Sequence, residues 1–418
     1  MFLMKKKRVL IICDLFPPSF GPRMGYLCKY LKQLGWEPVA LTEELNDSTF
    51  SFLSEECEVR RVNFFPASNK TLRRAQWFVV FILDFLFGLK DARFYREAKR
   101  LHRKEKFDLV LCSTYRTFPL GAALKMARKF GIPLISDLRD VMEQYTGNEF
   151  ISTSFKTIPL LDRWIVTSFR DKSLRQRNRA LRHSDWLVTV SPWHVELLKQ
   201  YNPNAALIYN GFDPEVFYPE QIVTDKFYVT YTGRILSLSM RDPSLLFEAV
   251  ALLAGEKKIV PHNFRVRWFV DDASEKVLKD EAAKYGVAGY MDFYGYVPAN
   301  EVPAVLNGSS VLLLLTNKSS DDGPKGLMTT KFFESIAVKK PLLCVRSDES
   351  YLEQAICEIK AGCSARAVDE AADFLMGKYA EWKANGYTTA HPDNEVLNRF
   401  SRKEQASQFS ALFDRVIK

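Results

Sequence analysis

The chain has 418 residues, of which 47% are hydrophobic and 13% aromatic, a composition that excludes general disorder and leaves room for two or three domains with substantial cores. Lysine and arginine number 59 against 50 aspartates and glutamates, which gives a net charge of +9. That charge suits a phosphate-bearing ligand, an anionic membrane surface or nucleic acid, and it does not choose among the three.

The first predicted element is a strand over residues 9–13, because an unbroken apolar run of this length is typical of a strand buried on both faces. Apolar side chains then recur at one-turn intervals over residues 26–34, which predicts a helix that ends at Gly35. The loop between them is rich in proline and contains Gly21. It would lie at the carboxyl edge of a sheet, where open α/β folds bind ligands. An ordinary connecting loop is the alternative.

A segment over residues 77–89 is apolar except for Asp84 and Gly88, and basic side chains flank it. It is too short to span a bilayer, but a helix of this kind can lie in the membrane interface. A helix buried against the first sheet explains the same residues, and we favour that interpretation. The arginine-rich segment over residues 169–186 is expected to be a helix with a solvated basic face.

Strand and helix candidates alternate over residues 107–207 and again over residues 226–345. This alternation predicts parallel sheets built from βαβ units. There are too many strands for one sheet, so we expect an α/β protein with two doubly wound, Rossmann-like domains. The predicted domains are residues 1–205 and residues 206–400.

Two arginines follow the first predicted strand of the second half. Arg234 comes after a glycine at the end of that strand, and Arg241 lies further along the same loop. A planar guanidinium at such a position can bind a diphosphate through two hydrogen bonds. Surface ion pairs are the alternative explanation for both residues.

A second candidate phosphate site follows the predicted strand over residues 311–315. Its loop contains Gly323, Pro324 and Gly326, and a helix begins near Met328. The apolar face of that helix turns Lys331 and Glu334 away from the core. The free N–H groups of a helix N-terminus bind anions, and a lysine adds charge to them.

Glu334 can accept hydrogen bonds from the vicinal hydroxyls of a ribose or a sugar. If the two sheets face each other, Gly21, Arg234, Arg241 and Lys331 would line one cleft, because all of them lie on or beside carboxyl-edge loops. An ordinary exposed lysine and glutamate are the alternative for the helix.

The cysteines and the N-terminus bear on the compartment. The seven cysteines include no CxxC pair, and Cys13, Cys112 and Cys344 stand inside apolar runs, which predicts core thiols in a reducing compartment. The first apolar run ends at Asp14, too early for a signal peptide. No run approaches the ~20 apolar residues of a spanning helix. We expect a cytoplasmic protein.

Several motifs, taken together and in this order, resemble those of the GT-B glycosyltransferases of family four, which are retaining enzymes that use nucleotide-sugars. They extend through most of the chain and are followed by a closing segment, NRFSRKEQASQFSALF. The motifs are FPPSFGP, ISDLRD, DWLVTVSPW, IYNGFDPEVF, YTGRI, FYGYVPANEVPAVLNGSSVLLLL and KFFESIAVKKPLL.

The resemblance implies roles for individual residues. Arg234 and Arg241 would neutralise the donor diphosphate and assist catalysis, while Glu334 would hold the ribose. Lys331, Met328, Thr329 and Gly21 complete the set expected to bind the donor. The family's first glutamate is replaced by Gly326 in this chain.

The family's histidine in the first domain is also missing from its usual place, where DLRD stands instead. That motif resembles a subgroup acting on lipid-linked or polysaccharide acceptors, so Asp140 and Arg139 become candidates on the acceptor side, with Asp140 catalytic. The resemblance further implies that residues 401–418 form a helix that returns to the first domain.

The expected function is therefore the retaining transfer of a sugar from a UDP- or GDP-sugar to a polysaccharide or lipid-linked saccharide. Basic side chains and a helix N-terminus can stabilise the leaving diphosphate without a metal, and no DxD motif follows a predicted strand. We expect no cofactor, no nucleic-acid partner and, for a lipid-linked acceptor, peripheral contact with the inner membrane face. A nucleotide-sugar epimerase of the same fold, a catalytically silent relative and a nucleic-acid-binding protein are the alternatives.

Overall fold

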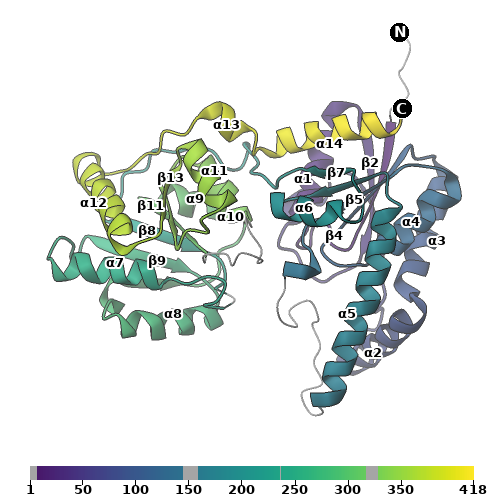
Figure 1. Ribbon diagram of the computed structural model, residues 1–418, viewed down its shortest axis with the longest axis horizontal. Coiled ribbons are helices and arrows are strands. Elements are labelled where there is room, and N and C mark those ends of the chain that lie inside the picture. The colour runs from purple at the N-terminus through teal and green to yellow at the C-terminus, as the bar shows by residue number, and fades with distance from the viewer. Residues whose placement is uncertain (1–6, 145–158, 236, 317–327) are drawn as a thin grey trace, which may run out of the picture. The chain divides into compact units, whose positions relative to one another are not determined.

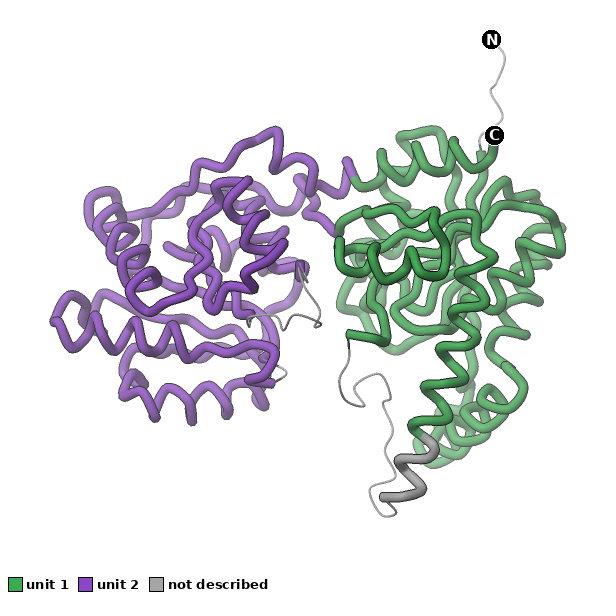
Figure 2. The backbone as a smooth tube through the Cα atoms, viewed as in Figure 1, with its two compact units in different colours: residues 1–209, 405–418 green, residues 210–404 purple. Residues whose placement is uncertain are grey.

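The computed structural model describes residues 7–144, 159–235, 237–316 and 328–418 (Figure 1). The chain divides into two compact units, which Figure 2 shows in separate colours. Unit 1 consists of residues 1–209 and 405–418, and unit 2 of residues 210–404. Each unit is built around a parallel sheet with helices packed against it, which confirms the expected fold class.

Unit 1 has a seven-stranded sheet in the order β3-β2-β1-β4-β5-β6-β7. Because β1 is paired with both β2 and β4, the chain order reverses beside it, and the loops after β1 and β4 diverge at this point of the carboxyl edge. The strands are β1 (Lys7–Cys13), β2 (Trp36–Glu43), β3 (Glu58–Val62), β4 (Leu109–Thr114), β5 (Leu134–Leu138), β6 (Trp186–Thr189) and β7 (Ala205–Leu207).

Both faces of this sheet are covered, because successive side chains of a strand point to opposite faces. Val9 and Ile11 of β1 pack in one cluster with Phe409, whereas Leu10 and Ile12 pack in a second cluster on the other face. The helices of unit 1 are α1 (Pro22–Leu31), η1 (Lys32–Leu34), η2 (Ser51–Leu53), α2 (Lys70–Phe87), α3 (Leu89–Lys104), α4 (Leu120–Phe130), η3 (Met142–Gln144), α5 (Pro159–Arg182), α6 (Pro192–Lys199) and α14 (Arg402–Val416), whose first three residues belong to unit 2.

The last helix, α14, packs on unit 1, as the family resemblance implied. The ring of Phe413 meets that of Trp36 edge-on at 5.1 Å, and Lys7 forms an ion pair with Asp414 at 2.6 Å. The C-terminal segment thereby covers the first strands of the chain.

Unit 2 has a six-stranded sheet in the order β10-β9-β8-β11-β12-β13. An apolar cluster lies against its central strands and includes the fully buried Phe227, Phe247 and Trp268. The strands are β8 (Phe227–Thr232), β9 (Phe264–Phe269), β10 (Met291–Tyr294), β11 (Val311–Leu315), β12 (Leu342–Val345) and β13 (Gly362–Ala365). The helices are α7 (Ser244–Gly255), α8 (Asp272–Lys284), η4 (Ala288–Tyr290), α9 (Val302–Asn307), α10 (Thr330–Ala337), α11 (Tyr351–Ile359), α12 (Val368–Asn385) and α13 (Asn394–Asn398).

The prediction that the apolar segment 77–89 is buried against the first sheet is wrong. No residue of α2 is buried, and large apolar side chains along it are exposed by between 37% and 77%. The reason is that α2 packs on other helices, with the rings of Phe81 and Phe85 stacked on Phe169 of α5, instead of on the sheet. None of the described helices is long and apolar enough to cross a membrane.

The arginine-rich helix α5 has the expected solvated residues, because Arg175, Arg179 and Arg182 are exposed, but one arginine of the run is buried. Arg177 is only 1% exposed, and its guanidinium binds both carboxylate oxygens of Glu143 at 2.6 and 2.7 Å. This arginine therefore fastens η3 to α5. The predicted core thiols Cys13, Cys112 and Cys344 are fully buried.

Candidate active site

In unit 1, Gly21 lies directly before α1 and allows a close approach of two backbone segments. A Cβ atom added there would lie 2.7 Å from the carbonyl oxygen of Leu15, so no other residue fits this position without a shift of the loop. The explanation for this glycine in the structure is thus packing of the first loop, and its role toward a donor remains a prediction.

The carboxylate of Asp14, at the carboxyl end of β1, collects several donors. Arg139 Nη2 lies 2.5 Å from Asp14 Oδ1, and Thr114 Oγ1 donates to Oδ2 at 3.0 Å. The sequence placed Arg139 on the acceptor side but gave no partner for it. The sequence could have indicated this pair, because Asp14 and Arg139 each directly follow a predicted strand of the same sheet.

A second ion pair, fully buried, was missed by the sequence analysis. Arg23 of α1 donates from Nε and Nη2 to Asp137 of β5, at distances between 2.9 and 3.3 Å. Its guanidinium also donates to the carbonyl oxygens of Ile208 and Tyr209. Because Ile208 and Tyr209 directly follow β7, these hydrogen bonds hold the chain after β7 to α1.

Asp140 lies just beyond β5, and burial raises the pKa of its carboxyl group. Gln144 Nε2 donates to Asp140 Oδ1 at 3.0 Å, and Gln144 Oε1 lies 2.9 Å from His194 Nε2. His194 is fully buried, which lowers its pKa to about 4, and its Nδ1 lies 3.1 Å from Thr189 Oγ1. A chain of hydrogen bonds thus fixes the side chain of Asp140.

In unit 2, the two predicted arginines lie together after β8. Arg234 is largely exposed and forms an ion pair at 3.3 Å with Asp271, which lies between β9 and α8. Arg241 Nη1 donates to the carbonyl oxygen of Arg234, and the same oxygen accepts a hydrogen bond from the hydroxyl of Tyr231 at 2.9 Å. The loop therefore brings two guanidinium groups to the end of one strand.

Lys331 of α10 reaches the same strand end. A Cβ atom added to Gly233 would lie 2.1 Å from Lys331 Cε and 2.6 Å from Lys331 Nζ, so the lysine passes directly over this glycine. Gly233 also has a φ of +122°, a conformation that other residues rarely adopt. Burial and the nearby Arg241 lower the pKa of Lys331 to about 8, although Glu334 opposes this shift.

Glu334 follows Lys331 by one turn of α10 and is half-buried. Burial raises the pKa of its carboxyl group to about 7, while the charges of Lys331 and Arg402 act in the opposite direction. A carboxylate kept apart from bulk water in this way retains acceptor capacity for a bound hydroxyl group.

Thr329 is the N-cap residue of α10, and Met328 before it is buried. The side chain of Thr329 makes no capping hydrogen bond, so the first N–H groups of the helix receive none from it. The loop positions Gly323, Pro324 and Gly326 lie outside the described residues. Of the predicted site residues, the structure brings together Arg234, Arg241, Lys331 and Glu334 in unit 2, whereas Gly21 and Asp140 belong to unit 1.

Within the described part of the chain, no group of three or more histidine, cysteine, aspartate or glutamate side chains is arranged to hold a metal ion. At the end of β8 the structure places three cationic side chains and one shielded carboxyl group. Such a set can neutralise an oxyanion and accept hydrogen bonds from hydroxyls.

Comparison with known proteins bears on the family of the first half of the chain. Residues 20–211 match the glycosyl transferase 4-like domain. This match ends at residue 211 and does not extend over unit 2. The sequence motifs resembled those of the same kind of enzyme. None of the curated proteins compared with this chain matches it by sequence.

Solved structures share the fold of this chain at low sequence identity. Sucrose-phosphate synthase from Thermosynechococcus elongatus has a TM-score of 0.63 at 14% identity, over 98% of each chain. HepE from Anabaena, solved with UDP and glucose, has a TM-score of 0.60 at 15% identity, over 98% of this chain and all of its own. A putative UDP-N-acetylglucosamine 2-epimerase from Listeria monocytogenes has a TM-score of 0.55 at 10% identity, over 98% and 96%.

Proposed function

We propose that this protein moves a sugar from a UDP- or GDP-sugar to a polysaccharide or lipid-linked saccharide, with retention of the anomeric configuration and without a metal ion. The observation that carries the proposal is the meeting of Lys331, Arg241 and Arg234 at the end of β8. That HepE was solved with UDP supports a uridine nucleotide as the first donor to test.

The charges of this cluster fit the reaction. Cleavage of the bond between sugar and phosphate builds negative charge on the leaving diphosphate, and preorganised cations stabilise that charge most effectively where water is scarce. Burial and Arg241 lower the pKa of Lys331 to about 8, so its charged form is destabilised in the free protein. A bound anion would stabilise that charged form. Glu334, on the same face of α10, would accept the hydroxyl hydrogens of the ribose.

The proposed acceptor side is unit 1, where Asp140 is held by Gln144 and has a raised pKa. A carboxyl group at this position can assist proton transfer to or from the acceptor. The family resemblance supports the proposal of retention. The positive charge of the cluster supports the proposal that no metal ion is needed.

The decisive experiment is a transfer assay with UDP- and GDP-sugars, after a thermal-shift screen has identified the nucleotide that stabilises the protein. Arg234→Ala should lower the turnover about a hundredfold, corresponding to about 2.7 kcal/mol. Lys279→Ala, which removes an exposed cation in an i,i+4 ion pair of α8, is the matched control. Near-normal turnover by folded Arg234→Ala would refute the assignment.

The same assay tests the finer claims. Activity should survive a chelator, and nuclear magnetic resonance of the product should show the anomeric configuration of the donor. Loss of activity with the chelator and its return with magnesium or manganese would refute metal independence.

An epimerase is the second candidate, because the Listeria protein with this fold is named as one. An epimerase would convert the free nucleotide-sugar into its epimer without an acceptor, whereas a transferase would release the nucleotide only as an acceptor is glycosylated. Analysis of the donor after incubation alone distinguishes the two.

We also propose that α2 makes peripheral contact with the inner membrane face. The exposed apolar side chains of this helix are Leu72, Trp77, Phe78, Val79, Ile82, Leu83, Leu86 and Phe87. Arg73 and Arg74 near its start are exposed. Lys90, which the sequence grouped with the flanking cations, forms an ion pair with Glu43 at 2.5 Å and is half-buried, so it does not belong to the membrane-facing set.

A further inference from the structure

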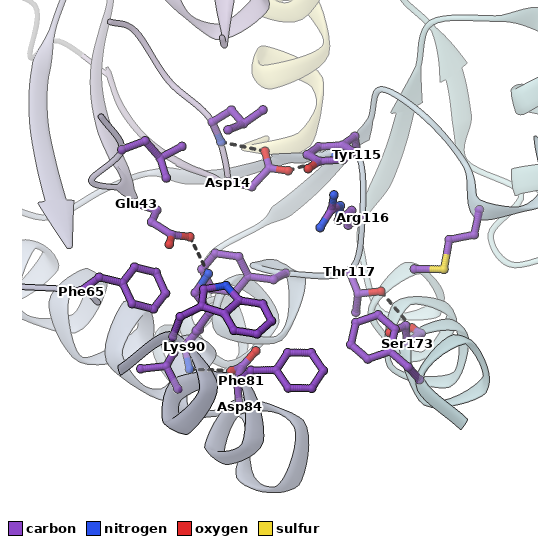
Figure 3. Close-up of a pocket in the computed structure, with 17 residues that line it drawn as sticks. Asp14, Glu43, Phe65, Phe81, Asp84, Lys90, Tyr115, Arg116, Thr117 and Ser173 are labelled. Atoms are coloured by element: carbon purple, nitrogen blue, oxygen red, sulfur yellow. Dashed lines mark hydrogen bonds and ion pairs between the residues drawn. The ribbon is translucent and has the colours of Figure 1, made fainter. Parts of the chain in front are cut away.

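Unit 1 contains a cavity of about 310 Å³ that neither the donor site nor Asp140 accounts for (Figure 3). Its volume is near the lower end of the ~300–1,000 Å³ range of small-molecule sites. Side chains from α2, α3, α5 and η3 line it, together with the segments after β1, β2 and β4. The cavity therefore lies at the reversal of strand order on the carboxyl edge, where ligands bind in folds of this type.

One side of the cavity is apolar and aromatic. Trp77 and Phe81 of α2 stack on each other with ring centroids 5.4 Å apart, and Phe81 stacks on Phe169 of α5 at 6.3 Å. Val80 and Phe65 add to the same lining. Surfaces of this kind bind apolar chains, because the association removes both from water.

The other side carries charge, and its carboxylates already have partners. Asp14 is paired with Arg139, Glu43 with Lys90, and Asp84 accepts a hydrogen bond from the backbone N–H of Lys90 at 2.7 Å. Burial raises the pKa of Asp84 above its ordinary value.

Arg116 is different. Its guanidinium forms no ion pair or hydrogen bond with the described residues, and its Nε is buried without a partner. Figure 3 shows it between Tyr115 and Thr117 in the cavity lining, and its guanidinium carbon lies 4.6 Å from the centroid of the Tyr115 ring. A buried donor without a partner is costly, and an oxyanion is the group that best satisfies an arginine.

The helix α2 links this cavity to the outer surface of the unit. Residues 77, 80, 81 and 84 line the cavity, while Phe78, Val79 and Ile82 are exposed. Apolar side chains thus occur on both sides of one helix that is not buried in the core. An apolar ligand inside and a membrane outside would together remove these side chains from water.

We propose that this cavity binds the lipid part of a lipid-linked saccharide, namely an apolar chain with a phosphate group, so that a hydroxyl group of the attached saccharide serves as the acceptor. The chain lies against Trp77, Val80 and Phe81, and the phosphate meets Arg116. Because the inference names the acceptor, it rests on the proposed glycosyl transfer. Its test measures binding without any donor, so that the two proposals can fail separately.

The probe is geranyl phosphate, titrated into the full-length protein by calorimetry, with geraniol and inorganic phosphate in parallel. We expect geranyl phosphate to bind more tightly than either. Arg116→Met should weaken its binding about tenfold or more, as loss of a charged hydrogen bond does, and should leave geraniol binding unchanged. Val80→Asn should weaken both, whereas the adjacent Val79→Asn, which makes the same change outside the cavity, should weaken neither.

Circular dichroism and thermal unfolding establish that each variant is folded. Equal binding of inorganic phosphate and geranyl phosphate would show a plain anion site and overturn the proposal. So would equal binding by wild type and folded Val80→Asn. Transfer to a soluble saccharide by a protein that does not bind the probe would refute the cavity's role and leave the proposed function standing.

Discussion

The position of Lys331 over Gly233 affects the pKa of its ammonium group. Its ammonium group lies over Gly233, within the reach of Arg241, where burial and a second cation both favour the neutral form. A bound donor diphosphate would favour the charged form of Lys331 instead, because its negative charge attracts the ammonium group that burial has removed from water. The free energy lost by burying the ammonium group of Lys331 is therefore offset when an anion binds.

This argument predicts a proton uptake. With a pKa of about 8, Lys331 is mostly neutral at pH 9 in the free protein, and UDP binding should restore a pKa near the ordinary value. Binding at pH 9 should therefore take up about 0.9 proton, and affinity should fall as pH rises above 8. Calorimetry in two buffers of different ionisation enthalpy measures the uptake. The same uptake in Lys331→Arg, which stays charged, would contradict the assignment.

Glu334 gives a second prediction at this scale. Since its raised pKa is about 7, the carboxylate is ionised above this pH and protonated below it. Glu334→Gln should weaken UDP binding about tenfold at pH 8, through loss of a charged acceptor, and by less at pH 6. Deoxy-UDP, which lacks a ribose hydroxyl, should show a smaller difference between wild type and variant. Unchanged affinity for UDP would return Glu334 to the class of ordinary helix residues.

Much of the candidate site in unit 2 could be predicted from the sequence because its parts come from short local patterns. Arg234 follows a glycine at a strand end, and Lys331 opens a helix after a buried strand. What could not be predicted is that Lys331 crosses Gly233, or that Arg23 pairs with Asp137 at 114 positions' separation. Contacts of this kind depend on strand order, which the local pattern does not contain.

At the scale of elements, α2 is where the sequence and the structure differ most. An apolar run of this length occurs both in core helices and in interfacial helices, so its composition cannot decide between them. The structure decides by position: α2 packs on α3 and α5, which leaves part of its surface exposed. By contrast, β1 and α1 could be predicted well, since an unbroken apolar run and a one-turn spacing each match a single kind of element.

The exposed face of α2 predicts association with anionic vesicles. Val79→Asp should weaken that association about tenfold or more, because it removes an apolar contact and adds repulsion from the anionic surface. Val260→Asp makes the same change at an exposed valine of unit 2 and should have no effect. Co-sedimentation at low and high salt measures the binding. If wild type fails to bind anionic vesicles at low salt, α2 has a packing role alone.

At the scale of the whole molecule, the residues proposed to bind the donor and those proposed to bind the acceptor belong to different units. The cations and Glu334 that would hold the donor all belong to unit 2, while the cavity and Asp140 belong to unit 1. The alternation of strands and helices was enough to predict two parallel sheets. It was not enough to predict the cavity, because that depends on how α2 and α5 pack beyond the sheet.

This division predicts two separate patterns of protection from hydrogen exchange. UDP should slow exchange in the peptides that carry Arg234, Arg241 and Lys331, since a ligand suppresses local opening where it binds. Geranyl phosphate should instead slow exchange in the peptides of α2, whose backbone bonds are poorly shielded because none of its side chains is buried. Mass spectrometry of the same sample with each ligand alone gives both patterns, and Lys331→Met should lose only the first. Protection of α2 by UDP, or of the strand end after β8 by geranyl phosphate, would show that the two sites are not independent and would contradict the division of roles.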